Sequence, residues 1–354
     1  MNRRQEFIDL YTKLHHGGLP DSQVRESIKA IMGISDPRLR GYLSETEHER
    51  SFTAPHMTLP QPHARAFPDP LRVPTPNALI ISDPHAPFHH RGLLHVALLI
   101  ARAMEITTVC FTGDVFNFDS INRHPKTGPE TNLEEDLRTG GSLLHATSQY
   151  MDDIYVMSGN HDANFAKRLD KRFPLDMLIQ AALGGKHLQA RLHVTDREWI
   201  HIGDTWDVGH LSQYARMPGK KAAAIAERRK RNIAVAHDHM QGFMSTPDGC
   251  YLGISTGCML HPNRFWYREQ AFNDFPDWKN GFLIIKNDVP YLFHEHGSSP
   301  LNGSKPWSYW EQEFSLDIRG TFAQYQEDER NITTFNPSTN EWTPSHHDPC
   351  SHSS

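Results

Sequence analysis

The sequence predicts an α/β protein in which two β-sheets pack together with helices outside them. Between residues 78 and 184, apolar strand-like runs alternate with helical segments, a pattern typical of parallel strands joined by right-handed crossovers. After residue 190 the apolar runs are mostly strands, and seven prolines over residues 51–77 precede the whole region. We therefore expect a helical appendage over 1–50, an extended linker over 51–77, one domain over 78–296, and a polar tail with little fixed structure over 297–354.

The first 50 residues have apolar side chains at helical spacing. One helix ends at Gly17-Gly18, and a second runs over residues 21–32. Gly33-Ile34-Ser35 follows, and Leu39 and Leu43 are four residues apart in the next segment. This half resembles the turn and second helix of a helix-turn-helix. Eight acidic residues balance eight basic ones up to residue 50, so a small helical accessory domain is the alternative to a DNA-binding one.

The main domain consists of short apolar runs separated by helices. The predicted strands are residues 78–82, 107–112, 154–157, 199–202, 233–236, 251–255, 281–285 and 291–294, and the predicted helices cover about 91–104, 132–150 and 219–231, with further helical turns up to 184. The first three strands alternate with helices, so they are expected to be parallel neighbours.

Composition excludes several classes of protein. Hydrophobic residues make up 38% and charged residues 22% of the chain, as in soluble globular proteins. No run approaches the roughly 18 apolar residues of a membrane span, and no apolar run follows the N-terminal basic pair, so we expect a cytoplasmic protein. The net charge of -6 provides no global attraction to nucleic acid. Four scattered cysteines without a Cys-x-x-Cys pair exclude zinc-finger and thioredoxin sites.

Five short clusters of metal-binding side chains each follow a strand-like run. They are Asp83-Pro-His85, Gly113-Asp114, Gly159-Asn160-His161-Asp162, Gly209-His210 and His237-Asp238-His239. In α/β folds the strand ends carry the chemistry, so these side chains are expected to converge. Together they supply seven O and N ligands and one further histidine, enough for two divalent cations. Mixed O and N ligation favours Mn, Fe, Zn or Co over Mg.

The order of these clusters resembles the calcineurin-like metallophosphoesterases over roughly residues 78–296. The Gly159-Asn160-His161-Asp162 block is its most specific part, and the flanks of the first cluster look most like members found in bacteriophages and prophages. The resemblance implies a four-layer α/β/β/α sandwich with two metal ions at the sheet ends. It places Asp83, His85, Asp114 and His239 on the first metal, and Asp114, Asn160, His210 and His237 on the second.

The resemblance also implies a mechanism. A hydroxide that bridges the two metals attacks the phosphate ester in line, and His161 protonates the leaving oxygen. Asp162 is expected to orient His161. We favour a phosphodiester as the substrate, with nucleic acid as one candidate, over a phosphomonoester or a phosphoprotein. A non-catalytic scaffold or a DNA-binding protein on the same fold are the alternatives from other classes.

Two departures from the family pattern count against two of its subgroups. Asn117 stands where the double-strand-break-repair nucleases of the family have His, and Phe118-Asp119-Ser120 stands where the protein phosphatases have Asp-Arg-Gly. Arg123 and His124 are candidate contacts for a substrate phosphate. Arg216 begins a basic stretch over 216–231 that could guide a polyanion, although a solvated helix face is the favoured explanation.

Overall fold

This computed structural model describes residues 3–52, 69–118, 132–169, 173–213, 215–261 and 278–330, together with strands β14 (Thr333–Asn336) and β15 (Glu341–Pro344). The chain divides into two compact units, Met1–Phe67 and Pro68–Ser354. Within the described part of the chain, no helix combines the length and the apolar character needed to cross a bilayer.

Residues 3–52, the described part of the N-terminal unit, form three helices where the sequence predicts them. They are α1 (Arg3–His16), α2 (Asp21–Met32) and α3 (Asp36–Phe52). Phe7, Val24, Ile28, Leu39 and Leu43 form their common core. Each helix contributes buried side chains to this core, and such packing is how short helices become stable.

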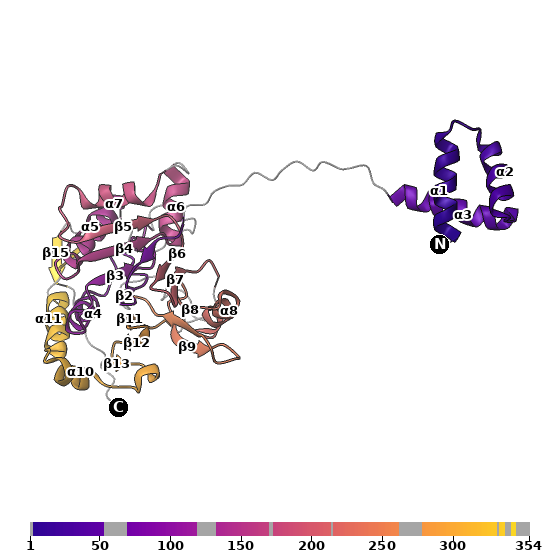
Figure 1. Cartoon of the computed structure of the whole chain (residues 1–354). Helices are drawn as coiled ribbons and strands as arrows, with labels where there is room; N and C mark the ends of the chain where they lie inside the picture. The colour runs from indigo at the N-terminus through magenta and orange to yellow at the C-terminus, as the bar shows by residue number, and fades with distance from the viewer. Residues whose placement is uncertain are drawn as a thin grey trace, which may run out of the picture. The chain divides into compact units, whose positions relative to one another are not determined.

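The described part of the larger unit contains two large mixed β-sheets (Figure 1) and a separate two-stranded sheet of β14 and β15. The seven-stranded sheet has the order β13 (Gly297–Ser298), β12 (Val289–His294), β11 (Gly281–Lys286), β2 (Ala78–Ile81), β3 (Thr108–Phe111), β4 (Asp153–Met157) and β5 (Arg191–Thr195). The six-stranded sheet has the order β1 (Arg72–Val73), β6 (Trp199–Ile202), β7 (Trp206–His210), β8 (Asn232–Ala236), β10 (Leu252–Thr256) and β9 (Gln241–Ser245).

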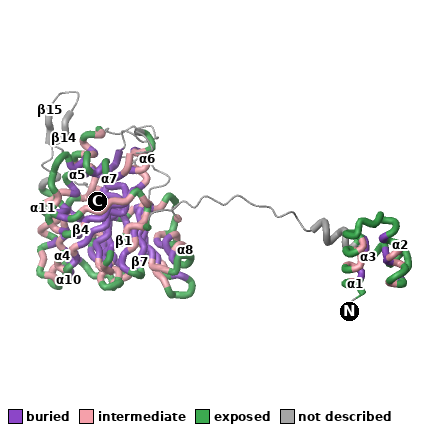
Figure 2. Tube along the Cα trace, turned by 45° about the horizontal axis from the view of Figure 1, so that its top comes forward, coloured by how far each residue is buried: buried purple, intermediate pink, exposed green. Residues whose placement is uncertain are grey.

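The two sheets face each other and helices cover their outer faces. Ile80, Cys110, Val208, Ile254 and Leu283 belong to one buried apolar cluster that joins the sheets. A second cluster packs the seven-stranded sheet against α4 (Arg91–Ala103), α5 (Leu133–Thr147) and α7 (Leu175–Leu183). Helix α8 (Lys220–Arg229) covers the six-stranded sheet. The strands form the buried centre of this unit (Figure 2). The predicted α/β/β/α sandwich is confirmed.

The region after residue 297 corrects the sequence prediction of a poorly ordered tail. After β13, a 3₁₀ turn (Pro300–Asn302) leads to α10 (Trp307–Phe314) and α11 (Ile318–Arg330). Trp307, Trp310 and Ile318 are buried. The ring of Trp310 lies edge-on to the ring of Phe293 in β12, with 5.2 Å between the ring centroids. The many polar residues of the segment lie on the outer faces of the two helices, and their abundance hid this apolar stripe in the sequence.

Candidate metal centre

The five clusters meet at one edge of the two sheets. Strands β2, β3 and β4 are parallel, and β7 is parallel to β8, so their carboxyl ends lie together. Asp83, Asp114 and Asn160 follow β2, β3 and β4, while His210 is the last residue of β7 and His237 follows β8. The side chains therefore converge because strand order brings these loops together, although Asp83 and His239 are 156 positions apart in the sequence.

The backbone of these loops is strained where the side chains are presented. Five of the seven expected ligands have positive φ: Asp83 (47°), His85 (45°), Asp114 (49°), His237 (86°) and His239 (53°). Side chains other than glycine rarely adopt this conformation, which costs of order 1 kcal/mol or more and concentrates at functional sites. The fold thus holds these five residues in conformations that an unconstrained loop would avoid.

Gly113 and Gly159 let two of the loops touch. A Cβ atom on Gly159 would lie 2.1 Å from Oδ1 of Asp114, and one on Gly113 would lie 2.7 Å from Cα of Gly159. Real Cβ atoms do not approach other atoms so closely, so only glycine fits at either position.

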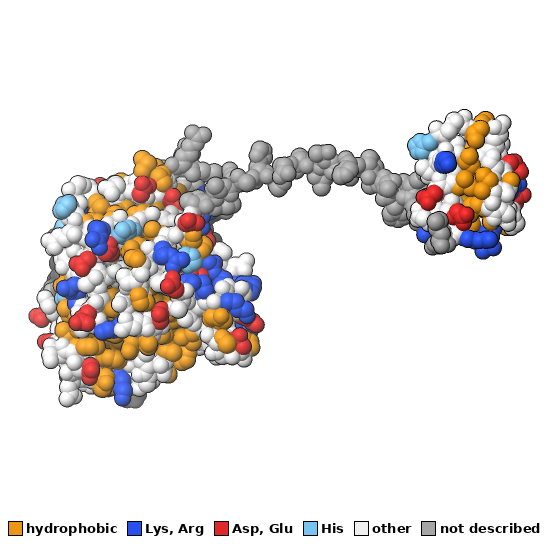
Figure 3. Space-filling view, in the orientation of Figure 1, with side chains coloured by type: hydrophobic (Ala, Val, Ile, Leu, Met, Phe, Trp, Pro, Cys, Tyr) orange, Lys and Arg blue, Asp and Glu red, His pale blue; other side chains and the backbone are white. Residues whose placement is uncertain are grey.

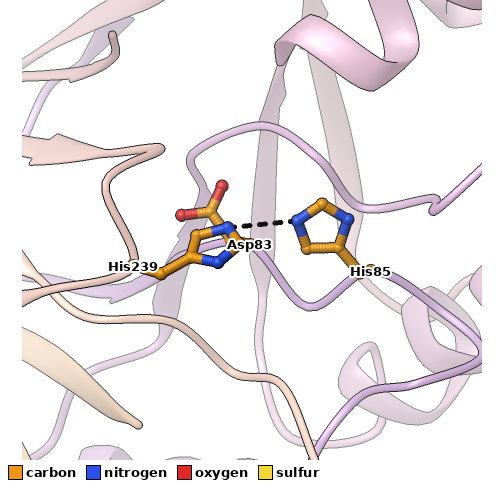
Figure 4. Close-up of side chains that lie close together, drawn as sticks. All are labelled: Asp83, His85 and His239. Atoms are coloured by element: carbon orange, nitrogen blue, oxygen red, sulfur yellow. Dashed lines mark hydrogen bonds between the residues drawn. The ribbon is translucent and has the colours of Figure 1, made fainter. Parts of the chain in front are cut away.

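One group of ligand atoms comes from Asp83, His85 and His239, all buried (Figure 4). The Nε2 atoms of His85 and His239 are 3.3 Å apart, and the three ligand atoms lie within 4.8 Å of one another. The main-chain N–H of His237 donates to Oδ2 of Asp83 at 2.9 Å. Oδ1 of Asp83 is buried and has no hydrogen-bond partner among the described residues.

A second group comes from Asp114, His210 and His237. Nδ1 of His210 donates to the main-chain carbonyl of Thr112 at 2.9 Å. Its Nε2 atom then lies 2.8 Å from Oδ1 of Asn160 and 3.4 Å from Oδ2 of Asp114. Nδ1 of His237 lies 2.7 Å from the same Asn160 oxygen. Nε2 of His210 therefore faces two oxygen acceptors, an arrangement that a cation between them would stabilise.

Asp114 stands between the two groups. Its Oδ2 atom is 3.4 Å from Nε2 of His210 and 3.8 Å from Nε2 of His85, while its Oδ1 atom accepts a hydrogen bond of 2.8 Å from the main-chain N–H of His161. One carboxylate thus faces the ligand atoms of both groups, as a shared ligand of two ions would.

The structure changes the role expected of Asp162. Its carboxylate Oδ2 accepts hydrogen bonds from the main-chain N–H groups of Gly159 at 2.9 Å and Asp114 at 3.1 Å. The His161 ring instead donates from Nδ1 to the main-chain carbonyl of Asn117. Asp162 therefore joins the two ligand-bearing loops, and Asn117 is the partner that orients His161. A main-chain acceptor carries no signal in the sequence, which is why it was missed.

Burial and mutual charge set the protonation of the site. Burial, with the neighbouring Asp114, raises the pKa of Asp83 well above its ordinary value. Burial acts the same way on Asp114, but the surrounding imidazoles, His210 foremost, outweigh it and lower that pKa. Burial lowers the pKa of His239 to about 3. A neutral imidazole keeps a lone pair for a cation.

These residues fit divalent cations. Two carboxylates, four imidazoles and one amide oxygen supply acceptor atoms at the mostly buried carboxyl ends of the strands. Isolated charges and unpaired acceptors are costly in such a place, so a cation among them would be stabilising. His161 also belongs to a possible ligand group with His85 and Asp114, and its ring lies edge-on to His85 at 4.7 Å.

The expected substrate residues are only partly placed. Arg123 and His124 lie outside the described residues. Arg216 is exposed in the loop between β7 and α8. Lys and Arg side chains gather on the side of the larger unit where Figure 1 shows α8 (Figure 3). Two cations of the basic stretch have structural partners, because Arg229 and Arg231 lie 2.8 Å and 2.7 Å from the buried Asp207 carboxylate.

Comparisons with known proteins agree with this geometry. Residues 76–251, about half of the chain, match the family model described as calcineurin-like phosphoesterase. Among solved structures, Yfce, a phosphoesterase from E. coli, aligns over 65% of this chain and 96% of its own, at 13% identity and a TM-score of 0.32. No curated protein matches the sequence significantly. The family match shows that residues 76–251 form a calcineurin-like phosphoesterase domain.

Proposed function

We propose that this protein hydrolyses phosphate esters with two divalent cations. Asp83, His85 and His239 hold the first, His210, His237 and Asn160 hold the second, and Asp114 is shared. The observation that carries the proposal is the position of Asp114, whose Oδ2 atom faces an imidazole of each group. Members of this family typically bind two divalent metals, and two buried ligand groups with one common carboxylate match that number.

The chain itself supplies proton transfer and orientation. The bound cations would supply an activated water molecule and positive charge for a phosphate. Asp83 and Asp114 offset only two of their four positive charges, so the centre attracts an anion. With Nδ1 donating to Asn117, Nε2 of His161 is the atom that delivers a proton to the leaving oxygen. The edge-on contact with His85 places this ring beside the ligand groups.

A phosphodiester is the substrate class we favour, with nucleic acid as one candidate and a phosphomonoester as the alternative. After Arg229 and Arg231 are assigned to Asp207, the exposed cations of this stretch are Arg216, Lys220, Arg228 and Lys230. They follow the His210 loop, so they lie on the chain segment that leaves the metal centre. Such cations favour a polyanion over a small monoester.

The test compares metal-free and Mn-loaded protein on bis-p-nitrophenyl phosphate, p-nitrophenyl phosphate and short DNA duplexes. We expect Mn-dependent hydrolysis, faster on the diester than on the monoester, with two metal ions per chain by elemental analysis. Asp114→Ala should lose metal and activity, whereas Asp152→Ala, at an exposed carboxylate, should keep both. Full activity in Asp114→Ala would refute the ligand assignment. If the metal-loaded protein hydrolyses none of these esters, the proposed phosphoesterase activity is refuted.

A second function, DNA binding by the N-terminal unit, is favoured by the turn between α2 and α3. Gly33 ends α2 in the left-handed conformation (φ 60°, ψ 39°), and α3 begins three residues later with Arg38 and Arg40 exposed. Helices joined by a three-residue turn with glycine are typical of a helix-turn-helix, whose second helix enters the major groove.

The full-length chain, inactivated by Asp114→Ala, should therefore retard duplex DNA in a gel at low salt. Arg38→Ala with Arg40→Ala should weaken this binding and lower its salt dependence by about two ions. The control pair Arg102→Ala with Lys186→Ala, exposed cations of the other unit, should leave it unchanged. No retardation at low salt, or an equal loss in both pairs, rules DNA binding by α3 out.

A further inference from the structure

A cavity of about 820 Å³ opens at the edge of the sheets that carries the metal centre. Strand β10 is parallel to β8, and β11 is antiparallel to β2. The residues after β10 and before β11 therefore lie at the edge where β8 and β2 end. The side chains that matter below are Phe243, His261, Trp278, Lys279, Asn280 and His294, all of which line the cavity.

Trp278 connects the cavity to the metal centre. Its ring lies 4.6 Å from the ring of His239, at 65° between the ring planes. The next residue, Lys279, donates its main-chain N–H to the carbonyl of His239 at 2.9 Å. In the segment after β10, the main-chain N–H of Met259 donates to the carbonyl of Asp83 at 3.4 Å. A group bound against Trp278 is therefore one side chain away from a residue of the first ligand group.

The cavity walls are held by hydrogen bonds. Nδ2 of Asn280 donates to Oε1 of Glu295 at 2.7 Å. Nε2 of Gln241 donates to the carbonyls of Thr256 and Phe293 at 3.2 Å and 2.6 Å. Both amide residues are only 8% exposed. These bonds link β9, β10 and β12 beneath the cavity, so its shape is largely preformed, and its volume lies in the usual range of about 300–1,000 Å³ for small-molecule sites.

The lining combines aromatic faces with polar side chains. Trp278 and Phe243 offer flat apolar surface, whereas His261 and His294 offer ring nitrogens and Lys279 an exposed ammonium group. A planar heteroaromatic ring suits this combination, because it stacks on an aromatic side chain and forms hydrogen bonds at its edge. A plain alkyl group would leave the polar side chains unmatched.

We propose that this cavity binds the nucleoside part of a nucleotide ester whose phosphate lies at the metal centre, with Trp278 stacking on the base. The inference rests on the proposed phosphoesterase function and specifies its substrate class. The base occupies the cavity, the phosphate lies beyond Trp278 near His239, and Lys279 stands at the wall between them.

The kinetic test uses two diesters that release the same leaving group: the p-nitrophenyl ester of thymidine 5'-monophosphate and methyl p-nitrophenyl phosphate. Because both reactions use the same metals and expel the same phenolate, the ratio of their kcat/KM values isolates the nucleoside. We expect this ratio to exceed about 10 in the native protein and to fall at least about tenfold in Trp278→Ala. Trp278→Phe should retain most of it, and Tyr309→Ala, an aromatic side chain 40% exposed on α10, should not change it.

A binding test separates this inference from the catalytic proposal. Thymidine 5'-monophosphate is titrated into chelator-treated protein by saturation-transfer NMR, where no turnover is required. We expect signal transfer to the base protons in the native protein and in Tyr309→Ala, and its loss in Trp278→Ala. A kcat/KM ratio near one overturns the nucleoside site even if both diesters are hydrolysed. If neither diester is hydrolysed, base-proton transfer lost in Trp278→Ala still supports the site, and its absence from the native protein refutes it.

Discussion

Nδ1 of His161 donates a hydrogen bond to the main-chain carbonyl of Asn117. A carbonyl oxygen can only accept, so the proton on Nδ1 is set by the fold, and Nε2 is the atom left to act on a substrate. Since the loop after β3 also carries Asp114, one segment holds both the shared carboxylate and the acceptor that orients the histidine.

His161→Ala should separate proton transfer from metal binding. If His161 is the general acid, the variant keeps two metal ions per chain and loses about 10²–10⁴-fold in kcat. The loss should be larger for an alkyl leaving group than for p-nitrophenolate, because the poorer leaving group needs the proton more. Loss of a metal ion, measured by elemental analysis, would instead make His161 a ligand. His187→Ala, an exposed histidine, is the matched control.

Asp162→Ala should destabilise the metal-free protein. The substitution removes the acceptor of two main-chain N–H groups, those of Gly159 and Asp114, and each unsatisfied buried donor costs about 1–3 kcal/mol. Asp162→Asn keeps one carbonyl oxygen and should lose less. Urea unfolding in chelator measures the difference. If Asp162→Ala unfolds at the same urea concentration as the exposed-site variant Asp152→Ala, the connecting role assigned to Asp162 is wrong.

Gly159→Ala should inactivate the protein through geometry alone. The added methyl group would lie 2.1 Å from Oδ1 of Asp114, so the shared carboxylate must move, and a displacement of about 1 Å costs on the order of 100-fold in rate. Metal stoichiometry and kcat on bis-p-nitrophenyl phosphate are the measurements. Gly41→Ala, where a Cβ meets nothing within 4 Å, should keep full activity. Normal turnover by Gly159→Ala would mean that the two loops separate freely.

Ile318→Ala should show that the C-terminal helices belong to the folded domain. Ile318 is completely buried in the cluster that contains α4 and Trp310, so its truncation should lower the free energy of unfolding by about 2–5 kcal/mol. Met177→Ala, at a side chain 52% exposed on α7, should change it by less than about 0.5 kcal/mol. Equal urea midpoints for the two variants would mean that residues 307–330 do not pack stably on the domain.

Several features could be predicted from the sequence because their causes are local. Apolar runs such as residues 78–82 and 107–112 become buried strands, and the helix at about 91–104 is observed as Arg91–Ala103. The ligand-type residues were identified because each follows a strand, and in a layered α/β fold strand ends meet. Metal chemistry depends on residue types that the sequence displays directly, such as Asp83, Asn160 and His239.

Other features were decided only by the tertiary structure. The strand over Arg191–Thr195 is only partly buried along its length, so its apolar signal was weak until it paired with β4. The acceptor that orients His161 is a main-chain atom with no side-chain signature, and the partner of Asp162 is a pair of main-chain N–H groups. Helices α10 and α11 gain their burial from Phe293 and α4, residues far away in the sequence. The sequence alone determined which atoms could bind a metal. The packing of distant loops decided how the two ligand groups share Asp114, because the distances between ligand atoms depend on segments that lie far apart in the sequence.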